Sequence, residues 1–197
     1  SVTVGSSVDF TANFPSATAG DVIDFKDENN NVLCSVTFSS NPVPCSTNTL
    51  AVGTHTITAR FRGTATSDPS TSNAVLQTVT MGYRSASSGA TSTNSPAAVA
   101  IPYPAGIVAG DALVAAVGVN GTATITTPSG WTKLGGDTTQ TGYRQSIYWR
   151  SATGTETGSV SFSITGSVTG TRAAGVMVAV NGGSPTAPAS VEYAGLA

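Results

Sequence analysis

The stretch Asp111-Ala-Leu-Val-Ala-Ala-Val-Gly-Val119 decides the fold, because eight uncharged residues follow a single carboxylate. Turn-forming residues lie on both sides of it, Pro104-Ala-Gly106 before and Asn120-Gly121 after. A short apolar run between turns is typical of a strand buried on both faces. A buried helix segment is the alternative, but Gly118 and the three valines favour a strand. The run is too short to cross a bilayer as a helix.

The rest of the chain alternates apolar and polar residues with the period of two that strands require, and it shows almost no helical periodicity. Leu50 and Val52 are expected to enter the core from a connecting segment. In the first half the alternation predicts strands near residues 2–4, 8–14, 23–25, 32–38, 43–45, 57–61 and 74–79. In the second half it predicts strands near Tyr83 and at residues 99–101, 111–119, 123–125, 143–150, 160–164 and 173–180.

The composition excludes several classes of protein. Only 9% of the 197 residues are charged, against roughly 25% in an average globular protein. The hydrophobic fraction of 39% still suffices for a core, which excludes a disordered chain. The formal net charge is -2, and the few Lys and Arg residues are scattered, so we expect no nucleic-acid binding. No segment is suited to membrane insertion.

Seven short strands within about 80 residues indicate an immunoglobulin-like sandwich. The segment Leu50-Ala-Val-Gly-Thr-His-Thr-Ile-Thr-Ala-Arg-Phe61 resembles the penultimate strand of bacterial Ig-like repeat domains, and residues 68–75 are similar to the Ser-rich tail that follows it. Residues 8–12 and 22–27 resemble earlier strands of that family. The resemblance covers residues 1–80. It implies a module of large secreted bacterial proteins, adhesins or phage virion proteins, without an active site.

The second half resembles a different sandwich, a jelly-roll type found in bacterial secreted proteins and in phage tail or fibre proteins. The similar pieces are a Gly-Asp turn with its strand at 104–114, a Pro-x-Gly-Trp-Thr turn at 128–132 and an aromatic strand at 143–150. We therefore expect an all-β chain with two sandwiches in series, residues 1–80 and 81–197. Related sequences tend to continue further, so the second sandwich is expected to be truncated or completed by a neighbour.

Cys34 and Cys45 are the two cysteines, and the pattern places them on successive strands of one hairpin that turns near Ser39. That geometry allows a disulfide, which would imply an oxidising compartment and an extracellular location. Two free buried thiols are the alternative. A redox pair would usually have Cys-x-x-Cys spacing, and a zinc site would need more ligands than the single histidine, His55, can add.

No set of residues predicts catalysis, a cofactor or a metal site. His55 lies within the Ig-like strand signature, where packing explains it, and no Gly-x-Ser-x-Gly elbow is present. The carboxylates at Asp21, Asp24, Asp27 and Glu28 lie close together in sequence. Calcium is conceivable there, but their spacing is not that of an EF-hand, and a solvated turn explains them better. Asp111 follows a turn glycine and is expected to accept hydrogen bonds from turn amides.

The aromatic strand at residues 143–150 offers the one candidate surface for a ligand or partner. Alternation puts Arg144, Tyr148 and Arg150 on one face, and Trp131 could lie near them. Aromatic rings and guanidinium groups on a sheet can stack on sugars or dock proteins. The alternative is that Tyr143, Ile147 and Trp149 form core and the arginines are solvated.

We therefore predict a non-enzymatic extracellular module that is structural or adhesive, part of a surface fibre, filament or phage virion surface. Its expected partners are other copies of itself or neighbouring surface subunits, through β-strand pairing at a sheet edge. A carbohydrate-binding module of a secreted adhesin or enzyme is the alternative, with glycans as ligands.

Overall fold

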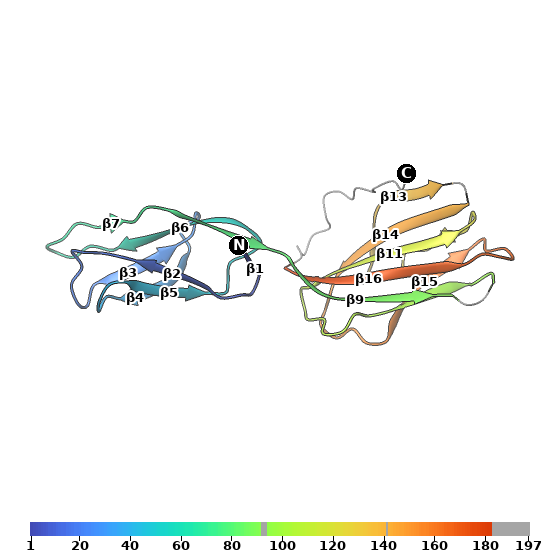
Figure 1. Cartoon of the computed structure of the whole chain (residues 1–197), viewed down its shortest axis with the longest axis horizontal. Helices are drawn as coiled ribbons and strands as arrows, with labels where there is room; N and C mark the ends of the chain where they lie inside the picture. Colours follow the sequence, from blue (N-terminus) through green and yellow to red (C-terminus); the bar gives the residue numbers. More distant parts are fainter. Residues whose placement is uncertain (92–93, 141, 183–197) are drawn as a thin grey trace. The chain divides into compact units, whose positions relative to one another are not determined.

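The computed structural model describes residues 1–91, 94–140 and 142–182, and every regular element in them is a β-strand (Figure 1). The all-β prediction is therefore confirmed. The chain divides into two compact units, Ser1–Met81 and Gly82–Ala197. This boundary lies one residue from the position that the sequence predicts.

The first unit consists of a large and a small sheet. The small sheet pairs β2 (Val8–Ala12) with β5 (Val43–Thr47) in antiparallel fashion. The large sheet runs in the order β1 (Val2–Thr3), β8 (Val75–Thr80), β6 (Gly53–Phe61), β3 (Val22–Lys26) and β4 (Val32–Thr37), with β7 (Ser70–Thr71) also on β6.

The core of the first unit lies between these two sheets. Alternation along β2 buries Val8, Phe10 and Ala12, and alternation along β6 buries Ile57, Ala59 and Phe61, as the sequence predicts. Leu50 also enters the core, but the prediction for Val52 is wrong, because this side chain is exposed. Val52 precedes the first residue of β6, so no strand geometry fixes its direction.

The second unit also has two sheets. One has five strands in the order β13 (Thr132–Gln140), β14 (Tyr143–Ser151), β11 (Ala112–Asn120), β16 (Ala173–Asn181) and β9 (Gly82–Ala90). The other has three, in the order β10 (Ala98–Pro102), β15 (Ser159–Thr165) and β12 (Thr124–Ile125).

The apolar stretch at residues 111–119 forms most of β11, which is the middle strand of the five-stranded sheet. Leu113, Ala115, Val117 and Val119 are fully buried and face the three-stranded sheet. The other face of β11 is covered less well, because Val114 and Ala116 are only partly buried. The prediction of a central strand is thus confirmed, whereas burial is complete on one face only.

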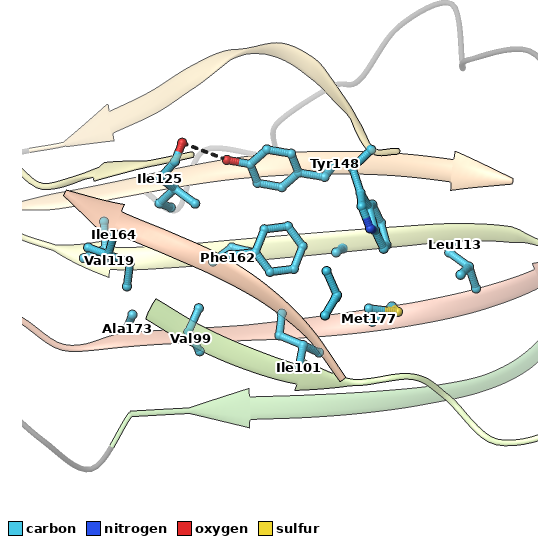
Figure 2. Packing of buried hydrophobic residues seen from close by; sticks show 14 of the residues in the cluster. Val99, Ile101, Leu113, Val119, Ile125, Tyr148, Phe162, Ile164, Ala173 and Met177 are labelled. Carbon is cyan, nitrogen blue, oxygen red and sulfur yellow. Dashed lines mark hydrogen bonds between the residues drawn. The ribbon is translucent and has the colours of Figure 1, made fainter. Parts of the chain in front are cut away.

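The inner core of the second unit is built around aromatic rings (Figure 2). Phe162 of β15 lies 5.0 Å from Tyr148 and 5.7 Å from Trp131, measured between ring centroids. Val99, Ile101 and Met177 complete the surroundings of these rings. Pairs of tilted or edge-on rings at such separations stabilise a core beyond the area that they bury.

Candidate functional site

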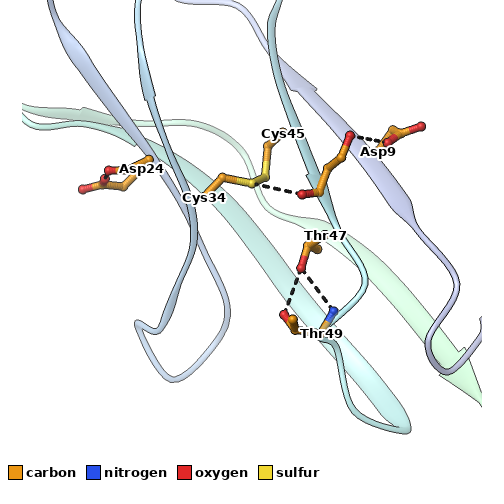
Figure 3. Close-up of a disulfide and its surroundings, with 8 residues drawn as sticks. Asp9, Asp24, Cys34, Cys45, Thr47 and Thr49 are labelled. Atoms are coloured by element: carbon orange, nitrogen blue, oxygen red, sulfur yellow. Dashed lines mark hydrogen bonds between the residues drawn. A yellow bond between two sulfur atoms is a disulfide. The ribbon is translucent and has the colours of Figure 1, made fainter.

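The cysteines form a disulfide, Cys34–Cys45, with 6.0 Å between their Cα atoms (Figure 3). The predicted hairpin that would contain both cysteines does not form. Strand β4 pairs with β3, and strand β5 pairs with β2. Each of the two strands ends its own sheet, so the disulfide joins the large sheet to the small one. The chain crosses from one sheet to the other between β4 and β5, as happens at the corners of a sandwich, instead of folding back within one sheet.

The predicted ligand surface of Trp131, Arg144, Tyr148 and Arg150 does not exist as an exposed face. Tyr148 is 0% exposed, and its hydroxyl donates to the Ile125 carbonyl oxygen at 3.2 Å. Trp131 is buried against Phe162 in the same core. The prediction chose the wrong face of β14, because Tyr148 and Ser146 face the three-stranded sheet, whereas Tyr143 is 44% exposed on the outer face.

The two arginines of that predicted surface lie toward the ends of β14 and are held by carboxylates. Arg144 Nη1 lies 3.5 Å from Asp137 Oδ2, and Lys133 and Ser146 also contact Asp137. Burial alone would raise the pKa of Asp137, but hydrogen bonds from Lys133 and Ser146 and the charge of Arg144 lower it instead. Arg144 therefore shares one carboxylate with Lys133, and this ion pair ties β14 to β13.

Arg150 has a carboxylate partner of its own, Glu156. Its Nη2 donates to Glu156 Oε1 at 2.9 Å, and its guanidinium lies 5.9 Å from the centroid of Trp131. Glu156 also accepts the amide of Thr153 at 2.7 Å and the amide of Gly154 at 2.8 Å. Burial opposes ionisation, yet these amides lower the pKa of Glu156. The group ties the 153–156 turn to β14 and has a structural role.

Among the clustered carboxylates of the first unit, Asp24 is not a solvated turn residue. Asp24 lies on β3 and is only 5% exposed. Its carboxylate accepts hydrogen bonds from Arg62 Nε and Nη2, each at 2.7 Å, and from the Ser35 hydroxyl. The two-pronged bond from Arg62 is the main reason that the pKa of Asp24 falls to about 2. The prediction of a turn is confirmed for Asp27, which caps the turn by accepting the amides of Asn29 and Asn31.

Asp111 has the turn role that the sequence predicts and a second partner that it does not. Its Oδ2 accepts the Val108 amide at 3.0 Å, and Arg84 of β9 donates through Nη2 to Oδ1 at 3.0 Å. Asp111 is almost fully buried, so the guanidinium compensates a charge that would otherwise be costly. Arg84 was not assigned a role from the sequence, because its partner lies 27 residues away.

His55 is held by groups that leave it no nucleophile to activate. Its Nδ1 lies 3.1 Å from Glu28 Oε1, and its Nε2 lies 2.9 Å from the Ala51 carbonyl oxygen. Among the described residues, no group of three or more His, Cys, Asp or Glu could hold a metal ion. The described part of the chain contains no helix that could span a membrane.

One apolar hollow in the first unit was not predicted. Residues 9–12 of β2 and the following Asn13 form one side, Ser72, Asn73 and Val75 form the other, and Phe25 and residues 57–59 form the floor. We call it the β2–β8 groove. Sequence alternation could not reveal it, because it depends on which strand edges remain unpaired.

Residues 1–80 match the family model of the bacterial Ig-like domain (group 3). The resemblance drawn from residues 50–61 is thereby confirmed for the first unit, which is an Ig-like domain at the N-terminal end of an all-β chain. No curated protein and no solved structure matches the chain.

Proposed function

We propose that this chain is a non-enzymatic extracellular module with a structural or adhesive role, part of a surface fibre, filament or phage virion surface. The match of residues 1–80 to the bacterial Ig-like domain is the observation that carries the proposal, because such a domain suggests a surface or extracellular-type module. A sandwich of this kind is a compact, rigid unit that can space and display a surface.

We further propose that the second unit is a jelly-roll-type sandwich. Its strand order supports this, with β9-β16-β11-β14 side by side in one sheet and β10-β15-β12 in the other. A jelly roll distributes eight strands over two sheets through two Greek keys. Here β13 departs from an even distribution, because it pairs with β14 and enlarges the first sheet.

The extracellular location is supported by the disulfide between Cys34 and Cys45, since such bonds persist in oxidising surroundings. A surface rich in Ser and Thr with little charge suits close packing of like copies, because few charges need to be desolvated or matched.

The non-enzymatic part of the proposal is supported by the bonding of the groups that could do chemistry. Asp24, Asp111, Asp137 and Glu156 each bind an arginine or lysine inside their own unit. His55 is occupied by Glu28 and a backbone carbonyl. Glycan binding stays a prediction without a site, because the rings of Trp131 and Tyr148 belong to the core.

The test uses the protein on its native source. Intact cells or particles are treated with a membrane-impermeant amine reagent, and tryptic peptides that contain Lys26 and Lys133 are quantified beside a disulfide map. The proposal predicts labelling of the chain without lysis and an oxidised Cys34–Cys45 pair. Labelling only after lysis, with both thiols free, would contradict it.

A further inference from the structure

We propose that the β2–β8 groove is an acceptor for an added β-strand, and that residues 183–197 of a second copy supply this strand. The inference deepens the proposed function and rests on it, because it names the contact through which copies would join. Strand addition of this type obtains affinity from backbone hydrogen bonds and specificity from alternate side chains.

Two strand edges border the groove without a neighbour. Within the part of the chain that the structure describes, β2 pairs with β5 alone, so its other edge has no strand partner along residues 8–12. Strand β8 pairs with β6 along residues 75–79, but β1 reaches only Val79 and Thr80 on its other edge. Unpaired edges of this kind are templates for another chain.

The floor of the groove is apolar and belongs to the core. Phe10 and Ala12 of β2, Phe25 of β3, and Ile57 and Ala59 of β6 all line it. These floor residues are between 2% and 8% exposed, so an added strand would gain its apolar contact mainly from Val75, which is 56% exposed, and its remaining affinity from backbone hydrogen bonds. Asp9 is the only charged residue in the lining, which favours an occupant with little charge.

Val75 marks the place where the inward face of the large sheet is exposed to solvent. It is opposite Ile57 in the β6–β8 ladder, so both belong to the face of the sheet that packs inward. Ile57 is 3% exposed, but Val75 is 56% exposed. On the same face Val79 is well covered, so the opening is confined to the end of β8 that β1 does not reach.

The chain continues beyond the described residues with a segment that suits this groove. Residues 183–197 include Val191-Glu-Tyr193, in which two apolar side chains two positions apart would share one face of a strand. Glu192 is the only charge in the segment, and Pro185 and Pro188 oppose strand pairing before it. About 15 extended residues reach roughly 50 Å, enough for a five-residue strand and a connection.

A contact of this kind would be head-to-tail. The groove belongs to the first unit of one copy, and the strand follows the second unit of its neighbour. Such a contact uses two different surfaces, so it generates open filaments unless the rotation closes a ring. It therefore accounts for a filament with no additional component.

The experiment compares the full chain with single variants by sedimentation over a concentration series. Val75→Asp puts a charge in the groove, and Val191→Asp puts one in the donor segment. We expect each to weaken association at least ten-fold. The matched control is Leu76→Asp, since Leu76 is 71% exposed on the opposite face of β8 and should leave association unchanged. Calorimetry confirms that each variant remains folded.

Hydrogen exchange gives a second readout on the same samples. The amides of β2 should gain protection as the full chain associates, and Val75→Asp should abolish the gain. The inference is overturned if Val75→Asp and Leu76→Asp associate equally, or if β2 is protected in a monomer. If wild-type chains assemble and Val75→Asp assembles as well, the proposed function stands and only this contact is wrong.

Discussion

Cys34 and Cys45 lie only 11 residues apart in the chain, yet their disulfide links two different sheets of the first unit. The bond therefore closes one border of the Ig-like sandwich, where β4 and β5 face each other without a shared ladder. Cys45 also belongs to the core, so the disulfide fixes the separation of the sheets as well as the loop.

Reduction of this disulfide should destabilise the first unit selectively. A loop of this size contributes about 3 kcal/mol, which corresponds to a fall in the unfolding midpoint of roughly 10 °C or more for a domain of this length. Both tryptophans, Trp131 and Trp149, lie in the second unit, and residues 1–81 contain neither Trp nor Tyr. Calorimetry with reductant should therefore show one shifted transition, while the tryptophan fluorescence transition stays in place. Equal shifts of both signals would contradict the assignment.

The Asp24–Arg62 pair predicts an acid-sensitive first unit. The pKa of Asp24 in the folded chain is about 2, below the unfolded value of about 3.9. Above about pH 4 the pair therefore stabilises the folded state by about 2 kcal/mol. This contribution is lost as the pH falls through about 2. Asp24→Asn should flatten the dependence of the calorimetric midpoint on pH between 4 and 2.

Removal of the cation at the same site gives a matched comparison. Arg62→Ala leaves the Asp24 carboxylate buried without its main partner, so we expect a loss of about 2 kcal/mol at pH 7. Arg60 lies opposite Asp24 in the β3–β6 ladder but is exposed and makes no ion pair in the described part of the chain. Arg60→Ala should change the unfolding free energy by less than about 0.5 kcal/mol. A similar loss in both variants would rule out the specific pair.

Loss of the hydroxyl group should destabilise the fold at Tyr148 but not at Tyr143, although both residues lie on β14. Tyr148→Phe leaves the buried Ile125 carbonyl oxygen without this donor and should cost about 1 kcal/mol. Tyr143 is exposed, so Tyr143→Phe should be neutral. Urea unfolding followed by tryptophan fluorescence measures both. A neutral Tyr148→Phe together with a destabilising Tyr143→Phe would mean that β14 presents its other face to the core.

Two glycines of the second unit offer a test of close packing. A Cβ at Gly89 would lie 2.0 Å from the Ala100 carbonyl oxygen, which is backbone and cannot move freely. A Cβ at Gly118 would lie 2.0 Å from the Tyr143 hydroxyl, the end of an exposed side chain that can rotate away. Gly89→Ala should therefore lower the unfolding free energy by about 1–3 kcal/mol, and Gly118→Ala should lower it much less. The same fluorescence assay ranks them, and the reverse order would contradict the packing.

Most strands were predictable because alternation in this chain is regular, as in Val160, Phe162 and Ile164 of β15, which are all buried. The sequence prediction missed β13, because Thr132–Gln140 has no regular apolar alternation. The exposed face of β14 was not predictable, because both faces of this strand carry aromatic residues. Periodicity assigns Tyr148 and Trp149 to opposite faces but does not say which face is covered. The disulfide pair was correct while its hairpin was wrong, since strand order between sheets depends on contacts that sequence spacing does not encode.

The two halves share no evident repeat in sequence, yet the structure shows one turn in both. In each case the backbone amide of the first residue donates a hydrogen bond to the side-chain oxygen of the fourth residue. The third residue is a glycine with positive φ. The pairs are Thr18 with Asp21, Val108 with Asp111, and Val168 with Thr171. Glycine at the third position supplies the left-handed backbone, so the similarity is local chemistry and not evidence of duplication.

Electron microscopy of the protein as its source produces it tests the central claim most directly, which is that this chain is a structural module of an extracellular assembly. The account predicts regular polymers or decorated particles in which an antibody against the chain labels at a constant spacing. Single, separate molecules in the medium, without a repeating arrangement on any surface, would contradict it.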